Sequence, residues 1–518
     1  MPLESSARIV AELTSRGYNA EREAVTLLAR ADDPGAAVDR ALEHAPPDAL
    51  TLTTEHVREA VDAANSAAAT RTANPSTSTN SPPEMKGVPA GSAGTTQPST
   101  NTETAATAAA DPTARPTDAA VAVDKDVTGR STGTGTYEDF VAVFRDRYER
   151  LSRMLRSRVN HRPTTAIPEM TGGTDVAIVG MVNDLRSTSG GHWLIELEDT
   201  VGTFPCLVTK DRDLASVVDE ILLDEVIAVE GTLADDGGIV FVDALHFPDV
   251  PRTHEPDWAD RHVQAALVSD VHVGSQEFLA GAWDRFADWL HTSEADPIEY
   301  LLLAGDMVEG VGVYPDQDEE LDIVDLYAQY ETFAERLKAV PGDLEIVMIP
   351  GNHDAVRLAE PQPAFDEELR DIMAVHDARV VSNPSMVTIE GVSVLMYHGV
   401  ALDEVIAELP AEKASYDEPH KAMAYLLKKR HVAPQFGERT RVAPEERDYL
   451  VIDEVPDVFH AGHVHKLGVG RYHNVTIVNS GCWQAQTAFQ RSVNIDPDAG
   501  FAPILDLDTG NVTLRKFV

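Results

Sequence analysis

The chain has 518 residues, of which 43% are hydrophobic, and its formal net charge is −44. A chain of this length predicts more than one folded domain. Two cysteines exclude a disulfide scaffold and indicate a reducing compartment, and the sequence shows neither a signal peptide nor an apolar run long enough to cross a bilayer. Acidic residues are spread over all segments, which favours a protein of a salt-rich cytoplasm over one that repels nucleic acid by its charge. We therefore expect a soluble, cytoplasmic protein without a membrane partner.

Residues 1–65 predict a small helical domain, because apolar residues recur there at helical spacing. It is either a docking module for a partner or a plain helical bundle. Residues 66–136 are rich in Ala, Thr, Ser, Pro and Gly and contain no aromatic residue. Such a segment cannot bury enough apolar surface to offset its chain entropy, so it predicts a disordered linker.

Residues 137–165 predict a connecting amphipathic helix with one apolar stripe from Phe140 to Val159. Its other faces carry six arginines, which form either a phosphate or partner contact or a solvated face paired with nearby acids. They are Arg145, Arg147, Arg150, Arg153, Arg156 and Arg158.

Residues 172–250 contain five apolar runs separated by turns, with a helical stretch after the third run. This order is typical of an OB-fold barrel. Such barrels bind single-stranded nucleic acid or serve as scaffolding beside enzymes, and these runs lack an obvious series of exposed aromatic residues. Direct DNA binding by this domain therefore stays an open alternative.

Residues 262–518 alternate apolar strands with helical stretches, which predicts an α/β domain. Five polar motifs each follow an apolar, β-branched run, so each lies where a strand ends and a loop begins. Such sheets carry their sites at the carboxyl ends of the strands. The motifs are Asp270-Val271-His272, Gly305-Asp306, Gly351-Asn352-His353-Asp354, Tyr397-His398-Gly399 and Gly462-His463-Val464-His465.

Seven side chains of these motifs are natural metal ligands, and they combine oxygen donors with imidazoles and no thiolate. This mixture suits Mn, Fe, Zn or Co, with Mn²⁺ the first choice and Mg²⁺ a further candidate, and argues against a calcium cage or a cysteine-type zinc site. The set can hold two divalent ions about 3.5–4 Å apart. The seven are Asp270, His272, Asp306, Asn352, His398, His463 and His465.

His353 directly follows the ligand Asn352 and should therefore point at the substrate. There it can stabilise charge on a reacting phosphate or protonate the leaving oxygen, with Asp354 orienting it. Asp306 is expected to bridge the two ions, which would lower the pKa of a bridging water. His353 and Asp354 are thus the candidate catalytic residues.

The five motifs resemble those of the calcineurin-like metallophosphoesterase superfamily, whose pattern is D-x-H, G-D-x-x-D/E, G-N-H-D/E, a lone His and G-H-x-H. The resemblance implies a β-sandwich flanked by helices. Glu309 stands where many members have Asp, at a position that is not a usual ligand. The resemblance also implies one ion on Asp270, His272, Asp306 and His465 and the other on Asp306, Asn352, His398 and His463.

Longer stretches resemble, more narrowly, the small subunits of archaeal family D DNA polymerases. This resemblance covers about residues 137–518 and implies a 3′→5′ exonuclease that proofreads single-stranded or frayed DNA 3′ ends within a heterodimer with a large catalytic subunit. A sliding clamp or a primase is a further candidate partner, through the N-terminal region. The alternatives are a stand-alone phosphodiesterase or repair nuclease, and a non-catalytic scaffold for the large subunit. The stretches are 303–315, 429–434, 448–457 and 479–487.

The densest basic run of the domain comprises Lys421 and Lys428-Lys429-Arg430-His431. It is either a contact to the DNA backbone or to the partner, or a helix face whose charges meet nearby acids. If it binds DNA, charge reversal at Lys428 and Lys429 should weaken binding.

Overall fold

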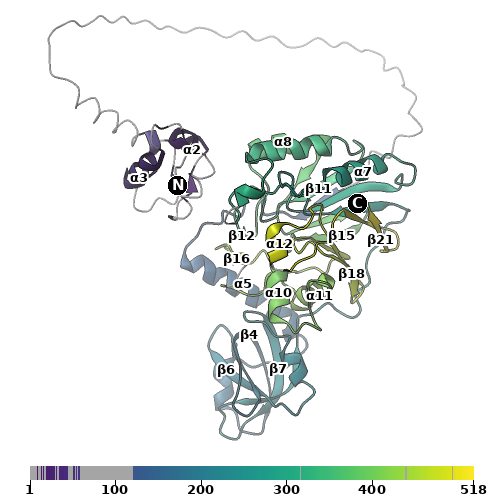
Figure 1. The fold of residues 1–518 in the computed structure, drawn as a ribbon. Helices are drawn as coiled ribbons and strands as arrows, with labels where there is room; N and C mark the ends of the chain where they lie inside the picture. The colour runs from purple at the N-terminus through teal and green to yellow at the C-terminus, as the bar shows by residue number, and fades with distance from the viewer. Residues whose placement is uncertain are drawn as a thin grey trace, which may run out of the picture. The chain divides into compact units, whose positions relative to one another are not determined.

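The computed structural model describes residues 121–518 except 315–316, 438–439 and 493, together with scattered positions between 9 and 58 (Figure 1). Contacts divide the chain into an N-terminal unit, Met1–Arg115, and a larger unit, Pro116–Val518. In the first unit, helices α2 (Arg22–Ala29) and α3 (Pro34–His44) bury apolar residues against each other. Two short strands, β1 (Asn19–Ala20) and β2 (Thr51–Leu52), pair in parallel. Most of the predicted linker lies outside the described residues.

The larger unit begins with β3 (Val121–Lys125), followed by α5 (Tyr137–Arg156) and the 3-10 helix η1 (Thr164–Glu169). The helix expected over residues 137–165 thus ends at residue 156. Pro163 excludes an α-helix over the last residues of the predicted range, because proline cannot continue an α-helix, and the helix already ends at its C-cap, Ser157. The buried stripe of α5 packs on the strands that follow.

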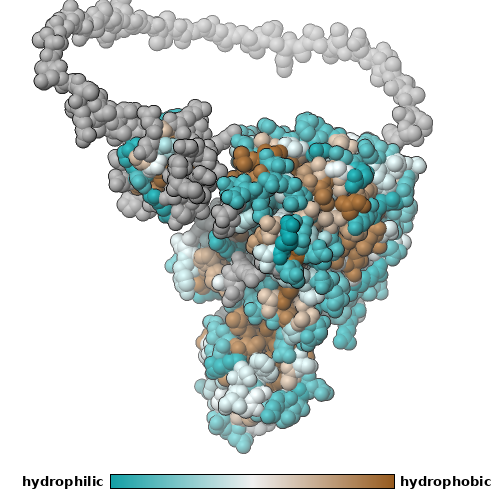
Figure 2. Space-filling model, in the orientation of Figure 1, coloured by the Kyte–Doolittle hydropathy of each residue, from teal (hydrophilic) through white to brown (hydrophobic). Residues whose placement is uncertain are grey.

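Five strands then close into a barrel in the order β4-β5-β6-β8-β7. Alternate side chains point inward and fill its core, and hydrophilic side chains occupy much of the outer face in view (Figure 2). A short helix, α6 (Ala215–Val218), follows the third strand. The strands are β4 (Asp175–Ser187), β5 (Trp193–Glu198), β6 (Thr203–Val208), β7 (Val226–Leu233) and β8 (Val240–His246).

The rest of the unit contains two six-stranded sheets. The first has the order β13-β11-β10-β9-β20-β21 and the second the order β18-β19-β17-β15-β14-β3. The first sheet is built from β9 (Gln264–Val268), β10 (Ile298–Ala304), β11 (Glu345–Ile349), β13 (Arg379–Val380), β20 (Phe501–Asp506) and β21 (Val512–Lys516). Besides β3, the second contains β14 (Ser385–Ile389), β15 (Val392–Met396), β17 (Val458–Ala461), β18 (Leu467–Tyr472) and β19 (Val475–Ser480).

Side-chain alternation explains how the two sheets pack. In β10, Tyr300 and Leu302 face a core shared with the second sheet, whereas Leu301 and Leu303 face a separate core beneath helices. Every residue of β10 is therefore buried, as expected for a strand covered on both faces. The outer cores are covered by α7 (Ala280–Leu290), α8 (Leu326–Leu337) and α9 (Glu367–Met373) on the first sheet and by α10 (Leu402–Glu408) and α11 (Pro419–Lys429) on the second.

Smaller elements connect these layers. They are η2 (Gln317–Glu320), η3 (Val375–Asp377), α12 (Ala488–Ser492) and the paired strands β12 (Ala359–Glu360) and β16 (Arg441–Val442). No helix in the described part of the chain combines the length and apolar character needed to cross a lipid bilayer.

The segment 121–136 departs from the prediction of a disordered linker that reaches residue 136. Its strand β3 pairs antiparallel with β14, and Val121 and Val123 pack against the sandwich core. The Ser131 hydroxyl then contacts Glu445. An edge strand needs no core of its own, because it uses the backbone groups and apolar face of an existing sheet. Linker-like composition therefore did not reveal it.

Candidate metal centre

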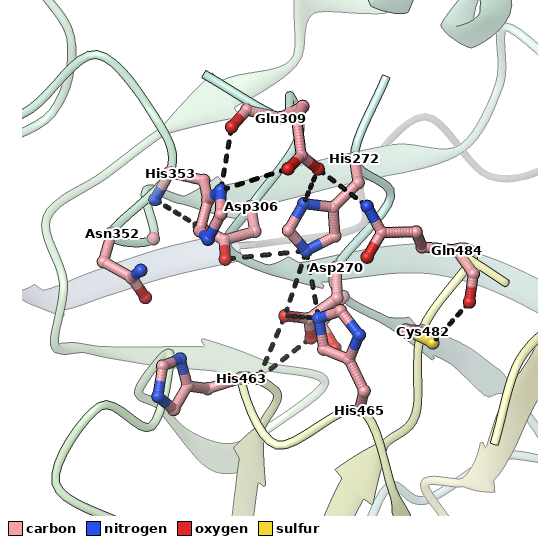
Figure 3. Close-up of polar contacts among 12 residues, drawn as sticks. Asp270, His272, Asp306, Glu309, Asn352, His353, His463, His465, Cys482 and Gln484 are labelled. Atoms are coloured by element: carbon pink, nitrogen blue, oxygen red, sulfur yellow. Dashed lines mark hydrogen bonds and ion pairs between the residues drawn. The ribbon is translucent and has the colours of Figure 1, made fainter. Parts of the chain in front are cut away.

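All five sequence motifs lie at the carboxyl ends of parallel strands. Two of the ligands follow β9, one follows β10, one follows β11, one follows β15 and two follow β17. Strands β9, β10 and β11 are parallel neighbours, as are β15 and β17. The loops after them bring the seven predicted ligands together in two groups, and Figure 3 shows all of them except His398 by label.

The first group contains Asp270, His272 and His465, all buried. The Nε2 atoms of the two imidazoles lie 3.0 Å apart. Oδ1 of Asp270 lies 3.4 Å from Nε2 of His465 and 3.9 Å from Nε2 of His272. Three donor atoms thus surround one point.

The second group contains Asp306, His398 and His463, with Asn352 beside them. Nε2 of His398 lies 3.2 Å from Oδ2 of Asp306 and 3.0 Å from Oδ1 of Asn352. The same Oδ2 atom lies 3.7 Å from Nε2 of His272 in the first group. One carboxylate oxygen therefore faces both groups, as a shared ligand must.

The backbone is strained where the ligands stand. Asp270, His272, Asp306, His463 and His465 all have φ between 52° and 72°, a left-handed conformation that non-glycine residues rarely adopt. Each such residue costs on the order of 1–3 kcal/mol, and such strain collects at functional sites. The packing of these loops therefore holds the ligand side chains in directions that a relaxed strand end would not give.

Two glycines permit the close approach of the loops. A Cβ atom on Gly351 would overlap Oδ1 of Asp306, and one on Gly462 would overlap Oδ2 of Asp270. A side chain at either position would also overlap the backbone nitrogen of Asp306 or the side chain of Ser269, so only glycine fits without a shift of the neighbouring loop.

Three contacts fix the orientation of the imidazoles. Nδ1 of His398 donates to the carbonyl of Ala304 at 2.9 Å, which leaves Nε2 for a ligand. Nδ1 of His465 contacts the side-chain amide of Gln490 at 2.8 Å. Nδ1 of His272 forms an ion pair at 2.8 Å with Glu309, in a direction poorly aligned for a hydrogen bond.

No role at the site was predicted for Glu309 from the sequence, yet its carboxylate contacts His272, one of the candidate ligands. Its buried carboxylate faces His272 and accepts hydrogen bonds from Gln484 and Gln317. Burial opposes its ionisation, but the charge of His272 holds the pKa of Glu309 at about 2. The only sequence feature that could have indicated this role is the acidic residue four positions after Gly305. Its contact with His272 becomes apparent only in the folded structure.

Opposite charges dominate the electrostatics of the centre. Burial favours the neutral form of Asp270, but the neighbouring imidazoles of His272 and His465 hold its pKa well below the usual range. Burial lowers the pKa of His398, and the charge of Asp306 more than offsets this, so that the pKa rises to about 9. Cation binding to these imidazoles would therefore release protons.

His353 projects into the cavity beside the two groups. Its Nδ1 donates to the carbonyl of Glu309 at 2.8 Å, and its backbone N–H donates to Oδ1 of Asp306 at 2.8 Å. The side chain of Asp354 instead accepts hydrogen bonds from Gly351 and from the Tyr330 hydroxyl. The expectation that Asp354 orients His353 is thus corrected: the Glu309 main chain does so, and Asp354 braces the loop.

Most of the basic run is buried and joins the sandwich to the barrel, whereas Lys421 is partly exposed and pairs with Glu418. Lys429 is fully buried, and its Nζ lies 2.6 Å from Oε2 of Glu225. Lys428 pairs with Glu220, and Arg430 is buried and donates to the carbonyl of Ile452. A DNA contact is therefore ruled out for Lys429 and Arg430, because the end of α11 packs against the barrel loop that carries the two glutamates.

The arginines of α5 divide in the same way. Arg147 is buried against Asp448 at 2.7 Å, and Arg150 pairs with Asp453 and Asp146. Arg145 and Arg153 are exposed. Arg147 and Arg150 of α5 thus pair with acidic residues, so the interpretation as a paired helix face applies to these two residues.

The donor set fits a pair of divalent cations. It offers imidazole nitrogens, carboxylate oxygens and one amide oxygen, and both cysteines are buried and belong to no candidate metal-binding group among the described residues. Two ring nitrogens held 3.0 Å apart, beside two ionised carboxylates, form a site whose charge a cation would balance.

Comparisons with known proteins agree on one family. The family of B subunits of DNA polymerases alpha and epsilon matches residues 265–467. The DNA polymerase II small subunit of Halobacterium salinarum is 67% identical, with 100% of each chain covered. That of Archaeoglobus fulgidus is 45% identical over 74% of this chain and 78% of its own.

A solved structure of asparaginyl-tRNA synthetase from Pyrococcus horikoshii is 18% identical over 17% of this chain and 23% of its own. Its TM-score of 0.16 is too low to indicate a shared fold. The full-length identity to the H. salinarum protein is decisive. The chain belongs to the family of archaeal DNA polymerase II (family D) small subunits.

Proposed function

We propose that the chain carries a 3′→5′ exonuclease that uses two divalent cations and proofreads for a large polymerising subunit. The observation that carries this proposal is the convergence of seven ligand side chains, from five separate strand ends, into two groups that share Asp306. The relatives are named as small subunits, so a large catalytic subunit is the expected partner. A clamp or primase partner for the N-terminal unit stays a prediction.

The architecture supports the same proposal. The closed barrel, with a helix between its third and fourth strands, suits an OB-type domain. Two stacked sheets with helices outside and ligands at strand ends suit a calcineurin-like phosphoesterase domain. Phosphodiester hydrolysis is the chemistry for which such a paired-cation arrangement is suited.

When bound, Mn²⁺ or a similar cation pair (Mg²⁺, Fe, Zn or Co) would supply Lewis acidity and a hydroxide nucleophile at neutral pH. Asp270, His272, Asp306 and His465 would hold one ion, and Asp306, Asn352, His398 and His463 the other. The contacts of His272 with Glu309 and of His398 with Ala304 keep the ligand nitrogens aimed inward.

His353 would manage the proton of the leaving group. Because Nδ1 donates to the Glu309 carbonyl, Nε2 is the ring nitrogen that can meet substrate. As the bond between phosphorus and the 3′-oxygen breaks, Nε2 donates a proton to that oxygen. The products are a 5′-mononucleotide and a strand that again ends in a 3′-hydroxyl.

The test is Mn²⁺-dependent release of mononucleotides from a DNA 3′ end, by the full chain with and without the protein that co-purifies with it. His353→Ala should abolish release while the chain still binds two metal ions, measured by elemental analysis. Release that persists in this variant would contradict the role of His353. Absence of release under both conditions would favour the scaffold alternative, and full activity without any co-purifying subunit would favour a stand-alone nuclease.

A further inference from the structure

Two stacked aromatic rings line one wall of the cavity over the candidate metal centre. Tyr314, in the loop between β10 and η2, stacks on Phe489 of α12 with ring centroids 5.8 Å apart and planes at 26°. The Tyr314 ring lies 6.3 Å from the ring of His353. Both rings line the same cavity as His272 and His463. We call Tyr314 and Phe489 the aromatic wall.

The aromatic wall is held in place yet open to solvent. The Tyr314 hydroxyl donates toward the carboxylates of Glu309 and Glu320, at 3.2 and 3.3 Å. Burial and the charge of Glu309 raise the pKa of Tyr314, so its ring stays a neutral phenol. Phe489 is 53% exposed. An apolar ring that faces a polar catalytic cavity is available to a flat partner.

The charges around the cavity indicate what that partner is. Among the described residues that line it there is no lysine or arginine. Phosphate contacts from basic side chains therefore cannot supply the binding energy there, and high salt would screen such contacts in any case. Stacking of a base on an aromatic ring needs no charged side chain. It accepts any of the bases, because each base has a π face.

We propose that the aromatic wall is a stacking platform for the base of the 3′-terminal nucleotide, an inference that rests on the proposed exonuclease. A paired terminal base must leave its partner and its neighbours before it can stack on protein, whereas for a mismatched base this step costs little. The platform thus selects unpaired 3′ ends without reading which base is present. Tyr314 and Phe489 are positioning residues for substrate rather than groups that take part in bond breaking.

A binding test separates the platform from catalysis. The full-length chain is titrated, with metal chelated by EDTA, into a single-stranded oligonucleotide that ends in 2-aminopurine, whose fluorescence is quenched by stacking. Phe489→Ala should lose most of the quenching and bind about 5- to 150-fold more weakly. Phe489→Trp should retain both. Phe436→Ala removes a ring of similar exposure, 43%, that packs against α5 outside this cavity and the barrel strands, and it should behave as wild type.

A kinetic test uses Mn²⁺ and two substrates, one with a normal 3′ base and one with an abasic 3′ terminus. Phe489→Ala should raise KM for the first substrate by a similar factor and leave KM for the second unchanged. Equal effects on both substrates, or wild-type quenching by the variant, would overturn the platform. Quenching without hydrolysis by the wild-type chain would support the platform and refute the exonuclease, whereas hydrolysis without quenching would do the reverse.

Discussion

Replacing Lys429 by methionine should destabilise the protein strongly, because it leaves a buried carboxylate without its cation. The Lys429 and Glu225 side chains are 0% and 1% exposed and lie 2.6 Å apart. Lys429 Nζ also donates to the carbonyl of Glu220. Removal of one partner from a buried ion pair costs about 3–5 kcal/mol. Desolvation already raises the pKa of Glu225, and Lys429 is the main group that offsets this.

Urea unfolding at constant KCl measures the effect. With an m value of about 3 kcal/mol/M, the loss lowers the midpoint by about 1–2 M. The matched control is the double variant Lys429→Met with Glu225→Leu, which replaces the whole pair by apolar side chains and should recover most of the stability.

The same variants decide between the structural and the DNA-binding interpretations of the basic run. Lys428→Gln removes a partly exposed charge next to the buried pair and should leave DNA affinity unchanged at matched salt. If Lys429→Met unfolded like the wild type but bound DNA more weakly, the assignment of this run to the interface with the barrel would be refuted.

Particular contacts lead to three more expected outcomes. Gly351→Ala should weaken metal binding by roughly 10–100-fold, measured as bound metal per chain, because the new Cβ displaces Asp306. Glu360→Gln should stabilise the protein by about 3 kcal/mol at pH 8 but not at pH 4. Burial raises the pKa of Glu360 to about 7, so between the unfolded-state pKa and pH 7 the folded state holds a proton that the unfolded chain has released. The stability of the wild-type protein therefore falls as the pH rises through this range, and glutamine removes that loss. Deletion of residues 1–136 should lower the free energy of unfolding by about 2–3 kcal/mol relative to deletion of residues 1–120, because only the longer deletion removes β3.

Each of these has its own check. Gly281→Ala, where an added Cβ would make only an ordinary van der Waals contact with Arg285 at 3.6 Å, should leave the metal content unchanged. Equal metal content in both glycine variants would mean that the loop after β11 yields to the added atom. A constant gain from Glu360→Gln across pH 4–8 would show that the pKa of Glu360 does not differ between the folded and unfolded states. Equal unfolding midpoints for the two deletions would show that β3 contributes nothing.

The convergence of the candidate ligands was predictable because each motif follows a buried run, and parallel strands bring their carboxyl ends to one edge. Asp270 and His463 are 193 residues apart and follow strands of different sheets, β9 and β17, so their contact depends on the packing of the two sheets against each other. The barrel was equally visible, since its strands alternate inward and outward residues. These features depend on local pattern, which the sequence carries directly.

Other features depend on partners far along the chain. Lys429 finds Glu225 at a separation of 204 residues, and no local pattern distinguishes that pair from a solvated charge. Strand β3 lies in a composition typical of a linker and gains its order from β14. The orientation of His353 comes from a main-chain carbonyl, a group that every residue carries, so no sequence pattern favoured Glu309 over Asp354.

Asp306 has a consequence for how variants of this site are interpreted. Its Oδ2 faces both ligand groups, while its Oδ1 accepts the backbone N–H of His353. Under the proposed mechanism, one carboxylate would thus serve both to bind the cations and to place the proton donor. Loss of activity in most Asp306 variants would not show which of the two roles is lost. Asp306→Asn keeps an oxygen that can accept the His353 N–H but removes the negative charge that would bind the cations, so it can separate the two roles.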